Sequence, residues 1–180
     1  MGFVAVGARA GQVPRVVVGI SRSPASWWAL AWAAGEARRR RARLVLVHVY
    51  RPQPAASCAD GDLGFPVTCR NPFADPAVYG DALISAAVRQ AVGQLPGDIG
   101  VDRRVVPGQA AIELARCARG GEILVLGARY HGRLRRHAAG HVARDCARYA
   151  DCPVALVPEP SPGALEPPAV GRPVHGAVTR

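Results

Sequence analysis

Hydrophobic residues along this chain gather in short continuous runs separated by longer segments with helical spacing. The runs predict strands near residues 15–20, 44–49, 101–106, 122–126 and 153–157. Because apolar and polar side chains do not alternate within these runs, they are typical of parallel strands that are covered on both faces. The segments between the runs are long enough for helices that carry the chain from one parallel strand to the next.

Signals at helix starts and ends place a helix after each of the first four strands. Ser23-Pro24 and Asp75-Pro76 each put a capping residue before a proline at the first helical position. The arginine run 38–41 is expected to end the first helix, Pro96-Gly97 to end the second, and Gly140 to precede the last. This alternation predicts an α/β fold: an open five-stranded parallel sheet with helices on both faces.

The pattern indicates one domain with irregular sequence at both ends and in one insertion. Residues 13–158 hold all the predicted elements, and a chain of 180 residues leaves no room for a second full domain. Residues 1–12 are expected to be disordered, and residues 51–74 form an irregular insertion that is longer than an ordinary connection. Residues 159–180 are rich in Pro and Gly and are expected to form a flexible tail.

Charge and cysteine content change this picture little. The formal net charge is +10, but all 23 basic residues are arginine, which indicates a composition bias rather than selection for polyanions. The five cysteines have irregular spacing, which is typical of reduced thiols in a cytoplasmic protein. No apolar run approaches the length of a membrane span or a signal-peptide core, so we expect no membrane partner.

The segment after the fourth predicted strand carries the clearest candidate chemistry. Gly127 closes that strand, Gly132 and Gly140 follow in a basic loop, and a helix begins after Gly140. Glycines between a strand and a helix let backbone N–H groups approach a phosphate, and the helix dipole favours the same anion. The spacing therefore predicts a nucleotide site.

Four segments together resemble the universal stress protein family. They are the strand 15–20 with Ser21, the strand 44–49 with His48, the turn Val105-Val106-Pro107-Gly108, and the closing run Asp151-Cys152-Pro153-Val154. The resemblance extends from Val13 to Pro158 in the family's order. It implies a Rossmann-like sheet of the adenine nucleotide alpha hydrolase type, with strand order 3-2-1-4-5 and the ligand beyond the carboxyl ends of the first and fourth strands.

The resemblance also implies roles for single residues in ATP binding. The family position of Ser21 normally holds an Asp that contacts the adenosine part of ATP, and the backbone around Val49 would border the adenine. A serine at this position can still form a hydrogen bond. It lacks the charge and the reach of an aspartate.

The family's phosphate loop is altered in this chain. Tyr130 stands where the family has a glycine, and His141 replaces a hydroxyl residue that contacts phosphate oxygens. Arg129 could supply compensating positive charge. The expected ligand contacts are those of Ser21, Val49, Gly127, Arg129, Gly132, Gly140 and His141. Because both ends of the ligand lose contacts, we expect ATP with magnesium to bind weakly or not at all.

The leading functional hypothesis is a stress-response regulatory domain that binds a protein partner or a nucleotide. No catalysis of its own is expected, or at most weak ATPase activity. Two alternatives stay open: an ATP-binding sensor that uses the altered loop, and a polyanion or nucleic-acid binder that acts through the loop arginines. The aromatic content of 6% disfavours recognition of single-stranded nucleic acid by base stacking.

The sequence disfavours two other kinds of chemistry. His137, His141 and Asp145 are four residues apart, but Gly140 interrupts the helix that would place them on one face, so no metal site is expected. Cys146 and Cys152 are expected to pack as small hydrophobic residues. No spacing places a serine or cysteine beside a base that a third group orients.

The last predicted strand indicates a homodimer. At the end of the order 3-2-1-4-5, residues 153–157 would form an apolar sheet edge, and such edges invite pairing with another chain. Members of the resembled family commonly pair this strand with its twofold mate. Pro153 and Pro158 would limit the pairing to a short central stretch.

Overall fold

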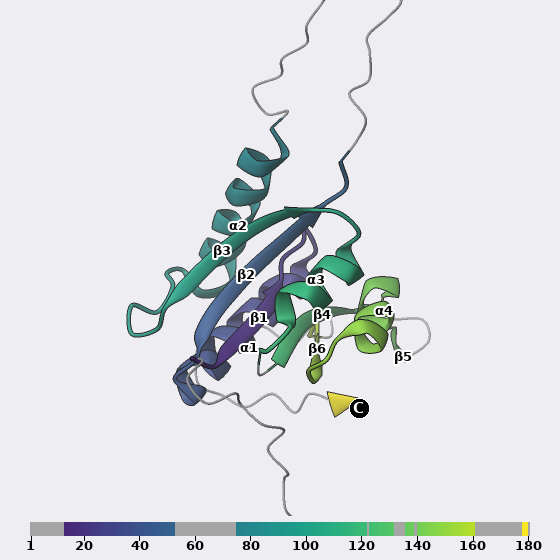
Figure 1. Cartoon of the computed structure of the whole chain (residues 1–180). Coiled ribbons are helices and arrows are strands. Elements are labelled where there is room, and N and C mark those ends of the chain that lie inside the picture. The colour runs from purple at the N-terminus through teal and green to yellow at the C-terminus, as the bar shows by residue number, and fades with distance from the viewer. Residues whose placement is uncertain are drawn as a thin grey trace, which may run out of the picture.

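The centre of the molecule is an open parallel sheet (Figure 1). The computed structural model describes residues 13–52, 75–121, 123–131, 136–138, 140–160 and 178–179. The parallel strands are β1 (Arg15–Gly19), β2 (Arg43–Tyr50), β3 (Val101–Pro107), β4 (Ile123–His131) and β6 (Val154–Pro158). Their order, β3-β2-β1-β4-β6, is the predicted order 3-2-1-4-5, so the predicted fold class is confirmed.

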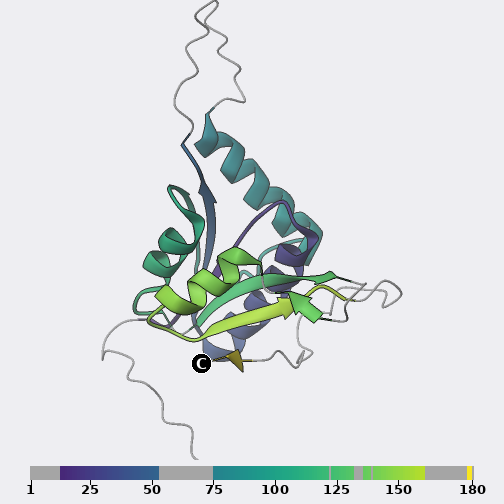
Figure 2. The same cartoon turned by 90° about the vertical axis from the view of Figure 1, so that its right-hand side faces the viewer.

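Helices cover both faces of the sheet (Figures 1 and 2). One face packs against α1 (Pro24–Arg40) and α2 (Pro76–Val92), and the other against α3 (Ala110–Ala118) and α4 (His141–Tyr149). In β1, Val16 and Val18 point into the first layer and Val17 into the second. Since successive side chains of a strand face opposite sides, a strand with two covered faces needs a continuous apolar run.

The strand register brings the carboxyl ends of three strands to one level. Val18 of β1 is paired with Leu46 of β2 on one side and with Val125 of β4 on the other. The residues that follow these pairs therefore emerge together at the same end of the sheet. This end holds the candidate site.

Two predicted element ends are wrong. The fourth strand does not close at Gly127 but continues to His131, because its last residues pair with the antiparallel strand β5 (Arg136–Ala138). The second helix ends at Val92 rather than at Pro96-Gly97, because Gly93 adopts a φ of 69° that turns the chain out of the helix. No described helix is long and apolar enough to cross a membrane.

The segment 159–180, predicted to be a flexible tail, contains a short strand. This strand, β7 (Val178–Thr179), pairs antiparallel with the outer side of β6, so β6 is not the last strand of the sheet. Residues 1–12, 161–177 and most of the predicted insertion 51–74 lie outside the described residues.

Helix α1 ends in a Schellman motif with an unusual residue. The N–H of Ala42 bonds to the carbonyl of Ala37 at 2.8 Å, and the N–H of Arg41 bonds to that of Arg38 at 3.1 Å. Arg41 has a φ of 51°, the left-handed conformation in which this motif favours glycine. Among the described residues it is the only non-glycine residue with a positive φ.

We expect Arg41→Gly to raise the free energy of unfolding by about 0.5–1 kcal/mol, because glycine adopts positive φ values without steric cost. Arg41→Ala, which removes the guanidinium but keeps Cβ, should leave the free energy of unfolding nearly unchanged. Urea denaturation of the three proteins measures both effects. A glycine variant no more stable than the alanine variant would contradict the interpretation.

Candidate nucleotide site

A cavity of about 200 Å³ opens at the carboxyl ends of β1, β2 and β4, between the amino ends of α1, α3 and α4. Four of the residues predicted from the sequence line it: Ser21, Val49, Gly127 and Gly140. The cavity lies where the chain connections on the two sides of β1 run in opposite directions along the sheet, the position at which open α/β sheets bind ligands.

The end of β1 is fixed by two side chains. The buried hydroxyl of Ser26 accepts a hydrogen bond from the N–H of Ser21 at 3.2 Å and lies 2.8 Å from the carbonyls of Ser21 and Ser23. Nδ1 of His48, on β2, lies 3.0 Å from the carbonyl of Ile20, so this nitrogen carries the proton and donates. Together these bonds fix the backbone of Ile20 and Ser21, which lines the cavity at the end of β1.

Gly127 has a packing role that the sequence did not reveal. A Cβ at this position would lie 2.3 Å from the carbonyl oxygen of Ala25 and 2.7 Å from the backbone nitrogen of Ser26. The first turn of α1 therefore rests directly on the backbone of β4. The absence of a side chain at Gly127 permits this helix–strand contact, besides lining the cavity.

The predicted phosphate loop is largely replaced by a β-hairpin. Tyr130 pairs with His137, and the flanking pairs join Arg129 to Ala138 and His131 to Arg136. Backbone groups in this ladder bond to the opposite strand, so they are not all available to a phosphate. Of the expected contacts here, Arg129 is placed only through its backbone in β4, and Gly132 lies outside the described residues.

The amino end of α4 borders the cavity and is open to a ligand. Gly140 is the N-cap residue, has no side chain to cap the helix, and would have nothing within 4 Å of an added Cβ. In the first turn the N–H of Ala143 bonds to the carbonyl of Gly140 at 2.9 Å, and the N–H groups that precede it lie ahead of the helix's own hydrogen bonds, at its positive dipole end. Gly140, Val142 and Ala143 line the cavity, whereas the predicted contact His141 is exposed and does not.

The cavity wall is mostly apolar and carries almost no charge. Among the described residues that line it there is no Asp, Glu, Lys or Arg, and His48 is the one titratable group. Ser21, Ser23 and Ser26 contribute hydroxyls on one side. Such a wall suits a flat, largely apolar ring better than a chelated metal ion, which needs several oxygen ligands.

The two thiols near the site, Cys146 and Cys152, have raised pKa values, which disfavours a role as nucleophiles. Cys146 is fully buried on α4, and its Sγ donates to the carbonyl of Ala111 at 3.7 Å. Burial raises the pKa of Cys146 to about 12, with further contributions from Asp145 and Cys152. Burial also raises the pKa of Cys152. Both thiols stay protonated at neutral pH, and the thiolate is the reactive form.

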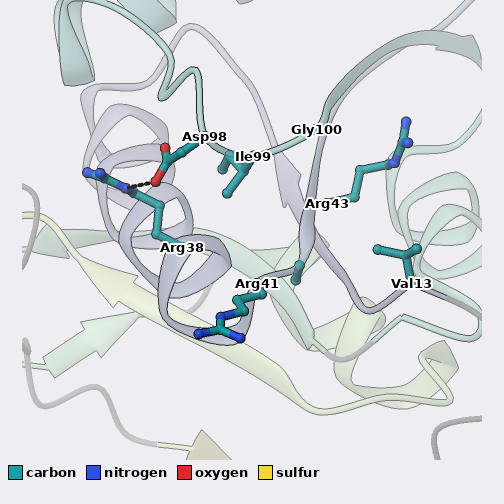
Figure 3. Close-up of a pocket in the computed structure, with 8 residues that line it drawn as sticks. Val13, Arg38, Arg41, Arg43, Asp98, Ile99 and Gly100 are labelled. Carbon is teal, nitrogen blue, oxygen red and sulfur yellow. Dashed lines mark hydrogen bonds and ion pairs between the residues drawn. The ribbon is translucent and has the colours of Figure 1, made fainter.

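A second hollow, of about 430 Å³, lies at the opposite end of the sheet beside the last turn of α1. Arg38, Arg41 and Arg43 surround it, but Figure 3 shows their guanidinium groups pointing in different directions. Arg38 bonds to Asp98 at 2.9 Å and Arg43 to Asp102 at 2.8 Å. Because the three guanidinium groups do not converge on one point, this hollow is a poorer candidate for anion binding than the amino end of α4.

Sequence reasoning missed two residues that shape the cavity. Ser26 is the third residue of α1, where the pattern predicted only helix, and its effect depends on its contact with the backbone of Ser21. His48 was noted as part of a strand but not as a cavity residue. Its signal was available, because an imidazole that directly follows four buried apolar residues of a strand is itself partly buried and needs a hydrogen-bond partner.

Solved structures with a similar fold are known, and one of them contains a bound nucleotide. A universal stress protein from Archaeoglobus fulgidus superposes with a TM-score of 0.57 at 19% identity, over 81% of this chain and 98% of that chain. Another structure of the universal stress protein from this organism, in complex with dAMP, has a TM-score of 0.51 at 18% identity over 81% and 98% of the chains. At these identities the likeness establishes the fold.

The sequence comparison identifies the family. Universal stress protein Rv2623 of Mycobacterium tuberculosis is 28% identical over 144 residues, which are 79% of this chain and 46% of that protein. The chain thus spans less than half the length of the curated relatives it matches. Residues 13–158 match the model of the universal stress protein family, and this span holds the five parallel strands and the residues that line the cavity. The chain therefore belongs to the universal stress protein family.

Proposed function

We propose that this chain is a non-catalytic regulatory domain whose cavity at the carboxyl ends of β1, β2 and β4 binds an adenine nucleotide. The observation that supports the proposal is that an apolar cavity lies next to the exposed amino end of α4. A nucleotide is complementary to both parts, because its flat ring suits the apolar lining and its anionic phosphate suits the helix amino end. In this proposal, the stress response depends on how occupancy of the cavity changes the surface that a partner contacts.

Each part of the ligand has a candidate position. The ring would lie among Ile20, Val49 and Leu126, which line the apolar part of the cavity. The phosphate would meet the first N–H groups of α4 next to Gly140. The dAMP complex of the Archaeoglobus fulgidus protein supports an adenine nucleotide as the ligand class for this fold.

The cavity favours binding over catalysis. Its lining offers serine hydroxyls, but Nδ1 of His48 is already committed to the carbonyl of Ile20, and no carboxylate among the described lining residues can orient a base. The same lack of carboxylates gives a magnesium ion no protein ligand there. Magnesium should therefore add little to nucleotide binding, and ATP with magnesium should bind weakly.

Calorimetric titration tests the proposal with dAMP, AMP and ATP, each with and without magnesium, and with GMP as the control for the base. We expect AMP and dAMP to bind at micromolar to submillimolar concentration, unchanged by magnesium, and ATP with magnesium to bind more weakly than AMP. If no adenine nucleotide binds at millimolar concentration, the proposed function is wrong. If binding requires magnesium, the assignment of the cavity chemistry is wrong.

A further inference from the structure

The outer side of β3 is a sheet edge with a regular set of backbone groups. β3 stands first in the strand order, and in the part of the chain that the structure describes no strand pairs with its outer side (Figure 1). The carbonyl of Gly100 and the N–H of Gly108 bond to β2, at 2.9 Å and 2.8 Å, so residues 100 and 108 face β2. Because successive residues of a strand turn their N–H and C=O groups to opposite sides, residues 101, 103, 105 and 107 face outward.

These outward groups match the backbone of an extended peptide. Val101, Arg103 and Val105 each offer an N–H and a C=O, and Pro107 offers a C=O only. Addition of a strand to an exposed sheet edge uses such a row of main-chain hydrogen bonds, and the side chains beside the edge then select the sequence of the added strand. The edge of β3 therefore has the backbone chemistry that strand addition requires.

The side chains beside this edge select for negative charge. Arg103 and Arg104 are both exposed, and since successive side chains alternate, they lie on opposite faces of the sheet. Arg103 bonds to Ser85 at 3.0 Å, and its nearest contact with the Asp81 carboxylate is 3.6 Å. The guanidinium of Arg104 has no ion-pair partner among the described residues. An added strand thus meets a cation on each face at the middle of β3.

The hollow beside the last turn of α1 extends this basic surface beyond the amino end of β3. Gly100 lines the hollow and directly precedes β3, so a chain that follows the edge past Val101 reaches it. Arg41 also lines the hollow, is exposed and has no ion-pair partner among the described residues. The spread guanidinium groups in Figure 3 suit several carboxylates along one extended chain better than a single small anion.

We propose that the outer edge of β3 and the hollow beside Gly100 bind an extended acidic segment of a partner protein, which adds to the sheet as a further strand. The segment has adjacent acidic residues opposite Arg103 and Arg104, with β-branched residues on either side that pack beside Val101 and Val105. This surface is separate from the nucleotide cavity, so the proposal does not depend on the proposed function.

An acidic peptide fits this edge better than other occupants do. Twofold pairing with a second copy of β3 would set the arginines of the two strands opposite one another, and like charges in opposition destabilise a strand pair. Exposed cations on an edge strand are a common protection against such self-association. A nucleic acid would satisfy the charges, but its backbone has no amide groups to match the alternating N–H and C=O groups of the edge.

The first test is binding of a fluorescein-labelled peptide, Glu-Glu-Val-Thr-Val-Glu-Glu-Val-Thr-Val-Glu-Glu, to the full-length protein. The same peptide with Gln at every Glu position is the control for charge. Fluorescence anisotropy gives the dissociation constants. We expect the acidic peptide to bind in the range of about ten to a few hundred micromolar and at least about tenfold more tightly than the Gln peptide, with the difference shrinking as salt is added.

Two pairs of variants separate charge from backbone pairing. Arg104→Glu should weaken binding of the acidic peptide at least about tenfold, whereas Arg148→Glu, the same change at an exposed position of α4, should leave it within about twofold. Arg103→Ala removes a guanidinium, and Arg103→Pro also removes an outward N–H, a change that edge strands tolerate. Arg103→Pro should therefore bind at least about threefold more weakly than Arg103→Ala, because it lacks one hydrogen bond to the peptide.

Four results would overturn the proposal. The edge is not an acidic-peptide site if the acidic peptide fails to bind at millimolar concentration or binds no better than the Gln peptide. If Arg104→Glu binds like the wild type, or Arg148→Glu loses as much, the attraction does not come from β3. If Arg103→Pro, with an unchanged circular dichroism spectrum, binds as well as Arg103→Ala, the peptide is not held as an added strand.

Discussion

Gly127→Ala is expected to lower the free energy of unfolding by about 3 kcal/mol or more. The added Cβ would lie 2.3 Å and 2.4 Å from the carbonyl oxygen and carbon of Ala25, and these are backbone atoms that no side-chain rotation can move away. Helix α1 would have to shift from β4, and overpacking of this kind typically costs about 1–3 kcal/mol even where flexible side chains can adjust. Urea denaturation monitored by circular dichroism measures the loss.

Gly140→Ala is the matched control for this prediction. It makes the same chemical change in the same cavity, but an added Cβ would have nothing within 4 Å, and Gly140 has a φ of −57° that alanine adopts readily. We expect it to lower the free energy of unfolding by less than about 1 kcal/mol, the scale of a change at an N-cap. Equal losses for the two variants would show that the contact between α1 and β4 does not depend on Gly127.

Ser21→Asp is expected to tighten the binding of AMP by about tenfold to a hundredfold, which corresponds to about 1.5–3 kcal/mol for a hydrogen bond to a charged group. Ser21 lies at the end of β1 on the cavity wall, and its backbone is already fixed by Ser26. A carboxylate there would reach toward the ribose hydroxyls without further ordering of the chain.

Two comparisons separate a ribose contact from a general effect of charge. Ser21→Asn has nearly the same shape as the aspartate but no charge, so it should tighten binding much less. The 2′,3′-dideoxy analogue of AMP lacks both ribose hydroxyls, so it should gain nothing from Ser21→Asp. If the analogue gains as much as AMP in calorimetric titration, the aspartate does not contact the ribose and the assigned ligand orientation is wrong.

Local patterns were sufficient to predict the layers of this fold. The continuous apolar run in β1 required a strand with both faces covered, and Val16, Val17 and Val18 do pack into two helical layers. The proline signal at Asp75-Pro76 marks the start of α2, where the Asp75 side chain accepts from the N–H of Ala77 at 2.9 Å. The strand order came from the family resemblance, because pairing between distant strands leaves no mark in any single segment.

Tertiary structure decided the details of the candidate site. The glycine spacing placed Gly127 and Gly140 beside a cavity but did not distinguish their roles, because only the return of α1 onto β4 makes the missing side chain of Gly127 a packing requirement. The β-hairpin and the strand β7 were likewise hidden, since each forms only when a partner strand supplies the backbone hydrogen bonds. The sequence by itself thus determined which faces of the strands and helices are buried, because the spacing of apolar residues along each element carries this information. Contacts between segments far apart in the chain decided the rest: the backbone of α1 lies against β4 beside the cavity, and β7 covers part of the edge of β6.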